Sequence, residues 1–346
     1  MSIFACIRRP LPGAFIALAL IATPASAATL AAPGGDYAVC IDKTGDTAMN
    51  ACDRAIALNT YRGNDLARLY VARAVLHYLK DAYEAAIDDA NAAVKHDGKL
   101  ASAYMVRGNI RHEMIEYDDA IGNYSEAIRL DPGGVVYYED RGKSWLAMHQ
   151  IDRAIADFDM FIKRAPRTPS GYINRAAAWK AKGDLDRAIV DLDKAIHYDP
   201  DNTEAFYQRA RIRGDRNDSD GALADYATAV RLMPDFSVAY NNRGAIFYDR
   251  GDWDRAIAEF DTAIRLPQAP AYYFVNRAEA HRARHDSTRA IADFTAAVAL
   301  EPTNALALYR RGIEKRKTGD TQGSVDDIAA AARIDADWVA EQLLKE

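Results

Sequence analysis

Apolar and polar positions repeat at a fixed spacing over most of the chain. The fragment Ala188–Ile196 returns as Ala154–Ile162, Ala256–Ile264 and Ala290–Val298, with its apolar residues three or four positions apart. That spacing places apolar side chains on one face of an α-helix. The copies lie multiples of 34 residues apart, so blocks begin at 67, 101, 135, 169, 203, 237, 271 and 305 without insertion or deletion. The pattern predicts an all-α chain made of eight copies of one unit.

Two small positions and one large position recur in these blocks. Position eight is small in each block: Ala74, Gly108, Gly142, Ala176, Ala210, Gly244, Ala278 and Gly312. Position twenty is small as well: Ala86, Ala120, Ala154, Ala188, Ala222, Ala256, Ala290 and Ser324. One helical turn later stand large residues: Tyr124, Phe158, Leu192, Tyr226, Phe260, Phe294 and Ile328. We expect the large side chains to fill the space that the small residues leave between two helices.

A proline closes five of the blocks, as Pro132, Pro166, Pro200, Pro234 and Pro302. Proline ends a helix because it has no N–H to donate. The period and these positions together resemble the tetratricopeptide repeat (TPR), a helix-turn-helix unit of about 34 residues. The resemblance covers residues 67–338 and implies an α-solenoid that winds as a right-handed superhelix and binds partners in a concave groove. It is weakest in the first and last blocks, where Ala90 and Ala336 depart from the pattern.

The first 27 residues differ from the rest. Arg8 and Arg9 precede an apolar stretch from Leu11 to Ile21, and small residues follow up to Ala27. The stretch is shorter than the ~20 residues that span a bilayer, so we expect a signal peptide cleaved near Ala27 and no membrane insertion afterwards. The expected segments are 1–27 (signal peptide), 28–66 (leader and N-terminal capping helix), 67–100, 101–134, 135–168, 169–202, 203–236, 237–270, 271–304 and 305–338 (repeats), and 339–346 (end of a C-terminal capping helix).

The capping region carries the two cysteines of the mature chain, Cys40 and Cys52. In an oxidising compartment such a pair most simply forms a disulfide, although two free thiols are the alternative. Residues 46–59 are predicted to form one helix that resembles the second helix of a repeat without its first.

An arginine stands at position seven of every block: Arg73, Arg107, Arg141, Arg175, Arg209, Arg243, Arg277 and Arg311. Position twenty-three is acidic in seven blocks: Asp89, Asp157, Asp191, Asp225, Glu259, Asp293 and Asp327. An anion-binding ladder of arginines is one interpretation. We favour internal pairs, because the two positions can face each other in a helical hairpin and a guanidinium binds a carboxylate with two hydrogen bonds.

Candidate partner-binding residues lie beside these arginines. In related arrays position six lines the concave groove and its asparagines grip an extended peptide. A side-chain amide can both donate to and accept from a peptide backbone whatever the peptide's sequence. Here the position holds Asn174, Gln208, Asn242 and Asn276. The same face is expected to carry Tyr207, Arg211, Asn241, Tyr248, Tyr272, Glu279 and Arg282. Ordinary solvated residues with no binding role are the alternative interpretation.

Other chemistry finds little support in the sequence. It contains no phosphate-binding glycine loop and no His-Glu-x-x-His or Gly-x-Ser-x-Gly motif, so we expect no catalytic site, cofactor or metal. The seven histidines are scattered and expected to be solvated or to cap helices: His77, His96, His112, His149, His197, His281 and His285. A formal net charge of −6 makes a nucleic-acid partner improbable.

The sequence therefore predicts a noncatalytic scaffold or adaptor in the periplasm that binds a peptide or protein partner in its concave groove. A secreted factor that acts on extracellular or host targets is the alternative.

Overall fold

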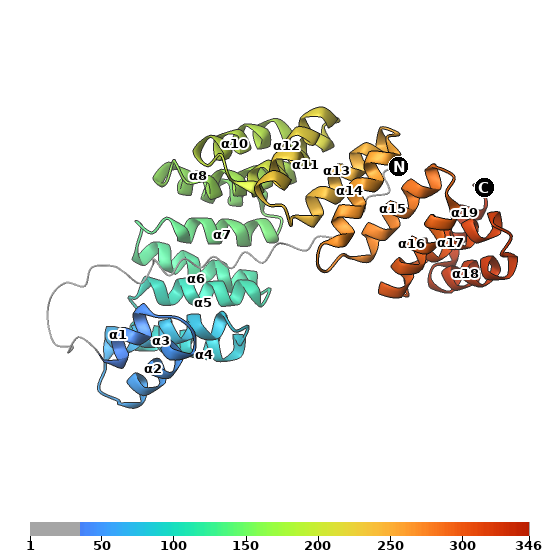
Figure 1. Cartoon of the computed structure of the whole chain (residues 1–346). Helices are drawn as coiled ribbons and strands as arrows, with labels where there is room; N and C mark the ends of the chain where they lie inside the picture. Colours follow the sequence, from blue (N-terminus) through green and yellow to red (C-terminus); the bar gives the residue numbers. More distant parts are fainter. Residues whose placement is uncertain (1–34, 346) are drawn as a thin grey trace. The chain divides into compact units, whose positions relative to one another are not determined.

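The computed structural model describes residues 35–345, so the predicted signal peptide lies outside the described residues. All regular elements of the described chain are α-helices, which confirms the all-α prediction. Contacts divide the chain into two compact units, one ending at Ala178 and one beginning at Trp179. The division falls inside one helix, α9 (Pro169–Lys182), and both units are made of α-helices (Figure 1).

The first unit consists of successive helical pairs. Its helices are α1 (Asp36–Asp42), α2 (Gly45–Ala57), α3 (Gly63–Tyr78), α4 (Tyr83–His96), α5 (Ala101–Glu113), α6 (Tyr117–Leu130), α7 (Val136–Ala147) and α8 (Ile151–Arg164), followed by α9 (Pro169–Lys182), which contains the division. The first helices α1, α3, α5 and α7 each pack on the second helix of their own pair, and the second helices α2, α4 and α6 each pack on the first helix of the next pair.

The second unit repeats this arrangement. Its helices are α10 (Leu185–Tyr198), α11 (Thr203–Asp215), α12 (Ser219–Leu232), α13 (Ser237–Asp249), α14 (Trp253–Arg265), α15 (Ala271–Ala283), α16 (Ser287–Leu300), α17 (Ala305–Lys317), α18 (Thr321–Ile334) and α19 (Ala336–Leu343). The short α19 packs on α18, and Val339 of α19 is buried. The predicted C-terminal capping helix is therefore present, although the number of repeat units stays a prediction.

Small residues let the two helices of a pair approach closely. A Cβ atom at Gly142 would stand 2.6 Å from Cε1 of Phe158, and one at Gly108 would stand 2.7 Å from Cε1 of Tyr124. Both aromatic rings are almost fully buried. The predicted packing of large against small residues is confirmed in these pairs, because an alanine in place of either glycine would overlap the ring.

The turn inside each pair requires a left-handed residue. Positive φ angles recur at the same block position: Asp81, Ile115, His149, Gly183, Asn217, Gly251, His285 and Gly319. This conformation ends a helix and favours glycine, asparagine or aspartate. Ile115 is unusual because it is β-branched and has a φ of 65°.

Replacing Ile115 with glycine should stabilise the fold. The isoleucine side chain is 72% exposed and thus contributes little buried area, whereas its left-handed backbone costs about 1–2 kcal/mol. We expect Ile115→Gly to raise the free energy of unfolding by about 1 kcal/mol in urea denaturation, since glycine's extra freedom in the unfolded chain offsets part of the gain. A variant less stable than wild type would mean that Ile115 makes a stabilising contact.

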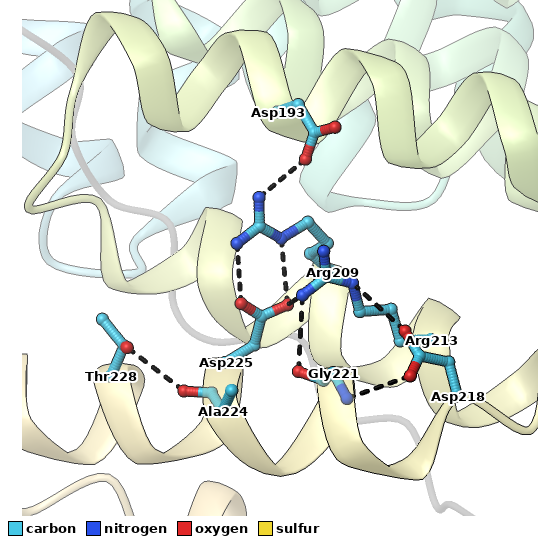
Figure 2. A network of polar contacts seen from close by, with 8 residues as sticks. All are labelled: Asp193, Arg209, Arg213, Asp218, Gly221, Ala224, Asp225 and Thr228. Carbon is cyan, nitrogen blue, oxygen red and sulfur yellow. Dashed lines mark hydrogen bonds and ion pairs between the residues drawn. The ribbon is translucent and has the colours of Figure 1, made fainter.

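The recurring arginines pair with carboxylates inside their own helical pairs. Arg209 of α11 donates from Nε and Nη2 to the two oxygens of Asp225 on α12, over 2.9 and 2.7 Å (Figure 2). Equivalent pairs join Arg73 to Asp89, Arg141 to Asp157, Arg243 to Glu259, Arg277 to Asp293 and Arg311 to Asp327. The six carboxylates are largely covered by the fold. The prediction of internal pairs is confirmed for these six arginines.

Most of the recurring arginines also form a hydrogen bond to the preceding helical pair, which the sequence did not predict. Arg209 Nη1 donates to Asp193 of α10 over 2.6 Å (Figure 2). The corresponding bonds join Arg73 to Asp53, Arg107 to Asn91, Arg141 to Ser125, Arg175 to Asp159, Arg277 to Asp261 and Arg311 to Thr295. One guanidinium thus ties three helices together. Arg243 lacks this bond, because Ala227 occupies the acceptor position. In addition, Nε of Arg243 is buried without a hydrogen-bond partner.

The N-terminal cap differs from the sequence prediction. Residues 45–57 form α2 as expected, but α1 precedes it and packs against it, so this second helix does have a short first helix. The helix α1 was not predicted, because its seven residues are too few to show a clear helical pattern of apolar positions. Cys40 of α1 and Cys52 of α2 form the disulfide, and both residues are buried against Leu66, Leu69 and neighbouring apolar side chains.

Candidate functional site

The first helices of the pairs form one continuous face in each unit. Successive first helices contact each other, α3 with α5, α5 with α7 and α13 with α15, whereas no comparable contact joins successive second helices among residues 35–345. We call the surface that the first helices present to solvent the first-helix face. All eleven predicted partner-binding residues lie on first helices.

The side-chain amides of this face bond to one another. Asn276 is 8% exposed and donates from Nδ2 to Oδ1 of Asn241, over 2.9 Å. Asn241 in turn donates to Oδ1 of Asn242 over 3.3 Å, and Asn242 donates to the hydroxyl oxygen of Tyr207 over 3.4 Å. In the first unit, Asn174 donates to Oε1 of Glu139 over 2.7 Å. Three of the four predicted ladder amides therefore bond to a side chain 35 positions earlier.

Gln208 is the exception among the four. The residue 35 positions before it is Ile173, which has no acceptor, and Gln208 donates to Glu204 of its own helix instead. Gln208 also accepts from Arg211, whose guanidinium lies 5.7 Å from the ring of Tyr207. All four amides thus already make intramolecular hydrogen bonds. Their role in gripping a peptide remains a prediction, and it would have to use the donors and acceptors that these bonds leave.

A group of charged residues lies further along the second unit, on α13, α15 and α17. Glu279 is 5% exposed and accepts from Nε and Nη2 of Arg282, over 3.0 and 2.8 Å. Nε of Arg310 lies 3.3 Å from the other carboxylate oxygen of Glu279 without forming a hydrogen bond. Burial raises the pKa of Tyr248, and Glu279 raises it further while Arg282 and Arg310 oppose this. These four side chains are therefore neighbours.

Glu314 of α17 extends this group. It is 1% exposed, accepts from Ser287 over 2.5 Å and accepts from Nζ of Lys317 over 2.6 Å. Burial alone would lower the pKa of Arg282, but Glu279, Tyr248 and Glu314 together raise it. We call Tyr248, Glu279, Arg282, Arg310, Glu314 and Lys317 the α15–α17 cluster. In it, buried carboxylates lie beneath cationic side chains that reach solvent.

A group of carboxylates lies on the first-helix face of the first unit. Glu139 and Asp140 share Lys143, whose Nζ lies 3.4 and 3.3 Å from their respective oxygens. Burial raises the pKa of Asp140; Lys143 opposes this shift and Glu139 adds to it. Glu113 accepts from the hydroxyl group of Tyr78 over 3.2 Å. Two neighbouring carboxylates thus share one lysine on α7.

The structure separates the predicted groove residues into two groups. Four are largely covered by neighbouring helices: Tyr207, Asn241, Asn276 and Glu279. The other seven keep part of their surface in solvent: Asn174, Gln208, Asn242, Arg211, Tyr248, Tyr272 and Arg282. Arg310, Glu314 and Lys317 were not predicted to take part. Arg310 stands at position six of the last block, where it replaces an amide, and its charge together with that of Glu279 one block earlier was the signal.

One histidine differs from the sequence prediction. His281 corrects the expectation that each is solvated or a cap: it is 6% exposed, and its Nε2 lies 3.8 Å from Oδ2 of Asp293. Burial lowers the pKa of His281, although Asp293 opposes this. Burial also lowers the pKa of His112, whose Nδ1 lies 2.8 Å from Oγ of Ser144. Within residues 35–345, no three His, Cys, Asp or Glu side chains converge in a way that could hold a metal ion.

Comparison with known proteins identifies the repeat. A family model described as tetratricopeptide repeat matches residues 139–205 and 207–272. The chain therefore contains tetratricopeptide repeats. None of the curated proteins matches its sequence. In the described part of this TPR protein, no helix is long and apolar enough to cross a bilayer.

Solved structures share the fold at low sequence identity. A TPR protein from Parabacteroides merdae ATCC 43184 is 16% identical, with a TM-score of 0.55 over 72% of this chain and 98% of that one. A chain of the APC/C hetero-tetramer Cut9-Hcn1 is 16% identical, with a TM-score of 0.53 over 90% and 61% of the two chains. A monomeric mutant of IFIT1 with m7Gppp-AAAA is 13% identical, with a TM-score of 0.53 over 83% and 77%. At this identity the likeness defines the TPR solenoid fold and not the ligand.

Proposed function

We propose that this TPR protein is a noncatalytic scaffold or adaptor of the bacterial cell envelope, and that it holds a peptide or protein partner on its first-helix face. TPR arrays generally serve as protein-binding scaffolds. The observation that carries the proposal is the set of half-exposed Tyr, Arg and amide side chains on successive first helices. Tyr and Arg supply much of the binding energy at protein interfaces, and amides can bond to a peptide backbone.

The compartment is proposed from the sequence and the cap. A signal peptide would deliver the chain to an oxidising compartment, where the buried Cys40–Cys52 disulfide is stable. Action on extracellular or host targets is the second possibility. Cell fractionation distinguishes them, because a periplasmic scaffold is recovered from the periplasm and a secreted factor from the culture medium. Retention of the full-length chain in the cytoplasm would contradict both.

Site-specific photocrosslinking tests the binding face. A photoreactive amino acid at Tyr248, on the first-helix face, should capture a discrete partner in intact cells. The matched control is Val325 of α18, which is 57% exposed and lies on a second helix. Equal capture from both positions, or capture from Val325 alone, would place the partner elsewhere.

Substitution of exposed residues on the first-helix face is a second test of whether this face binds the partner. Arg211→Ala combined with Tyr248→Ala should abolish capture from a probe at Tyr272, while circular dichroism shows the same helix content and melting temperature. Arg255→Gln on α14, where the arginine side chain is 66% exposed, should leave capture intact. Persistence of the crosslink in the double variant would show that these side chains do not bind the partner.

A further inference from the structure

The α15–α17 cluster presents cations to solvent and keeps its carboxylates below them. The side chains of Glu279 and Glu314 are only 6% and 1% exposed, whereas those of Arg282 and Lys317 are 27% and 51% exposed. Arg310 contributes a third cation with an 18% exposed side chain. A ligand on this surface therefore meets positive groups, although two negative charges lie close by.

The carboxylates also fix the cations in place. Arg282 is bonded through two nitrogen atoms to one oxygen of Glu279, and Lys317 is bonded to Glu314. Side chains that are already ordered lose less conformational entropy when they bind a ligand than free side chains lose. The cluster thus has the properties of a prepared anion-binding surface rather than of flexible surface charges.

We propose that the α15–α17 cluster binds an extended acidic peptide segment, with its carboxylates directed at Arg282, Arg310 and Lys317. This inference rests on the proposed function and names the chemistry of the partner at one place on the first-helix face. A carboxylate forms short, charge-assisted hydrogen bonds with guanidinium and ammonium groups. The tyrosine hydroxyl of Tyr248 adds a neutral donor next to the cations.

The charges around the α15–α17 cluster limit where an acidic peptide segment can bind on the first-helix face. Three cations face two carboxylates within the cluster, so the cluster has one surplus positive charge. Asp249, the residue after Tyr248, is exposed at the edge of the cluster and adds a negative charge there. The face of the first unit, with Glu113, Glu139 and Asp140, repels the same ligand. Acidic residues of the partner are therefore expected to bind at the cluster and not along the whole face.

Binding of short labelled peptides tests the proposal. A fluorescein-labelled peptide of alternating Glu and Gly residues is compared with Lys–Gly and Ser–Gly peptides of equal length by fluorescence anisotropy. The Glu–Gly peptide should bind roughly tenfold tighter than either of the others. Raising the salt from ~0.1 M to ~1 M should remove the difference, because the Debye length falls from about 10 to about 3 Å.

Charge variants locate the binding site. Lys317→Gln and Arg282→Gln should each weaken binding of the Glu–Gly peptide by roughly tenfold, and Asp249→Asn should strengthen it. Lys317 is half exposed, so Lys317→Gln is expected to fold even if Arg282→Gln is unstable. The control Arg255→Gln makes the same change in net charge on α14 and should leave the affinity unchanged.

The outcomes separate this inference from the proposed function. Failure of the Glu–Gly peptide to bind, or equal binding of the Ser–Gly peptide, overturns the acidic-segment proposal. Equal loss in Arg255→Gln and Lys317→Gln overturns it as well, because net charge alone would then explain the binding. Photocrosslinking from Tyr248 decides the proposed function independently, since it does not depend on the partner's charge.

Discussion

Arg141→Ala is expected to lower the free energy of unfolding by about 3–5 kcal/mol, the usual loss when one partner of a buried ion pair is removed. Asp157 is 5% exposed and accepts two hydrogen bonds from Arg141, over 2.8 and 2.7 Å. No second cation contacts Asp157 among the described ion pairs, so its carboxylate would remain buried without compensation. Urea denaturation monitored by circular dichroism measures the effect.

Arg209→Ala is the matched comparison. Its partner, Asp225, is equally buried but also accepts from Nη1 of Arg213 over 2.8 Å (Figure 2). We therefore expect this variant to lose clearly less stability than Arg141→Ala, although still more than an exposed pair loses. If Arg141→Ala lost less than about 1 kcal/mol, the pair would behave like a surface salt bridge and the buried interpretation would be wrong.

Removing the disulfide should have the second large effect. Replacing both Cys40 and Cys52 with serine is expected to destabilise the N-terminal cap by about 3 kcal/mol, because the closed loop no longer restricts the unfolded chain. The new hydroxyl groups would also lie among Leu66, Leu69 and other apolar side chains. Hydrogen exchange followed by mass spectrometry should show faster exchange in α1, α2 and α3.

The location of the change is the critical observation. In a repeat array each unit is stabilised mainly by its neighbours, so α17 and α18 should exchange at the wild-type rate. Cys40→Ala with Cys52→Ala serves as a control, because it removes the disulfide without adding polar groups. Unchanged protection of α1 and α2 in both variants would show that apolar packing alone holds the cap.

The fold was largely predictable because the same types of residue return at the same positions in successive blocks of the sequence. Small and large residues at fixed positions predicted the helix pairing seen at Gly142 and Phe158. The arginine and acidic positions predicted the pair of Arg209 with Asp225. The bond from Arg209 to Asp193 was missed, because the acceptor position varies among Asp, Asn, Ser and Thr and two blocks have alanine there. A varied position gives no periodic signal.

The candidate site was less predictable because groove positions differ from block to block. The sequence placed Asn242 and Asn276 on the first-helix face, but it could not reveal that Asn276 bonds to Asn241 or that Glu279 lies under Arg282 and Arg310. These contacts depend on side-chain lengths and distances across neighbouring helices. Only the three-dimensional arrangement distinguishes a residue that offers its polar atoms to a partner from one that uses them internally.

The hydrogen bonds from the recurring arginines to the preceding helical pair all point toward the N-terminus. Each joins a helical pair to the one before it, so deleting the last pair would leave the exposed hydroxyl group of Thr295 without its donor, Arg311. Deleting the first pair would instead leave a partly buried guanidinium without its acceptor, and water solvates a buried group less well than an exposed one. At the N-terminal end of the array, Asp53 of the capping helix α2 accepts from Arg73 and so supplies the acceptor that this guanidinium needs. The arginine bonds therefore all run in one direction along the chain, from each helical pair to the pair before it.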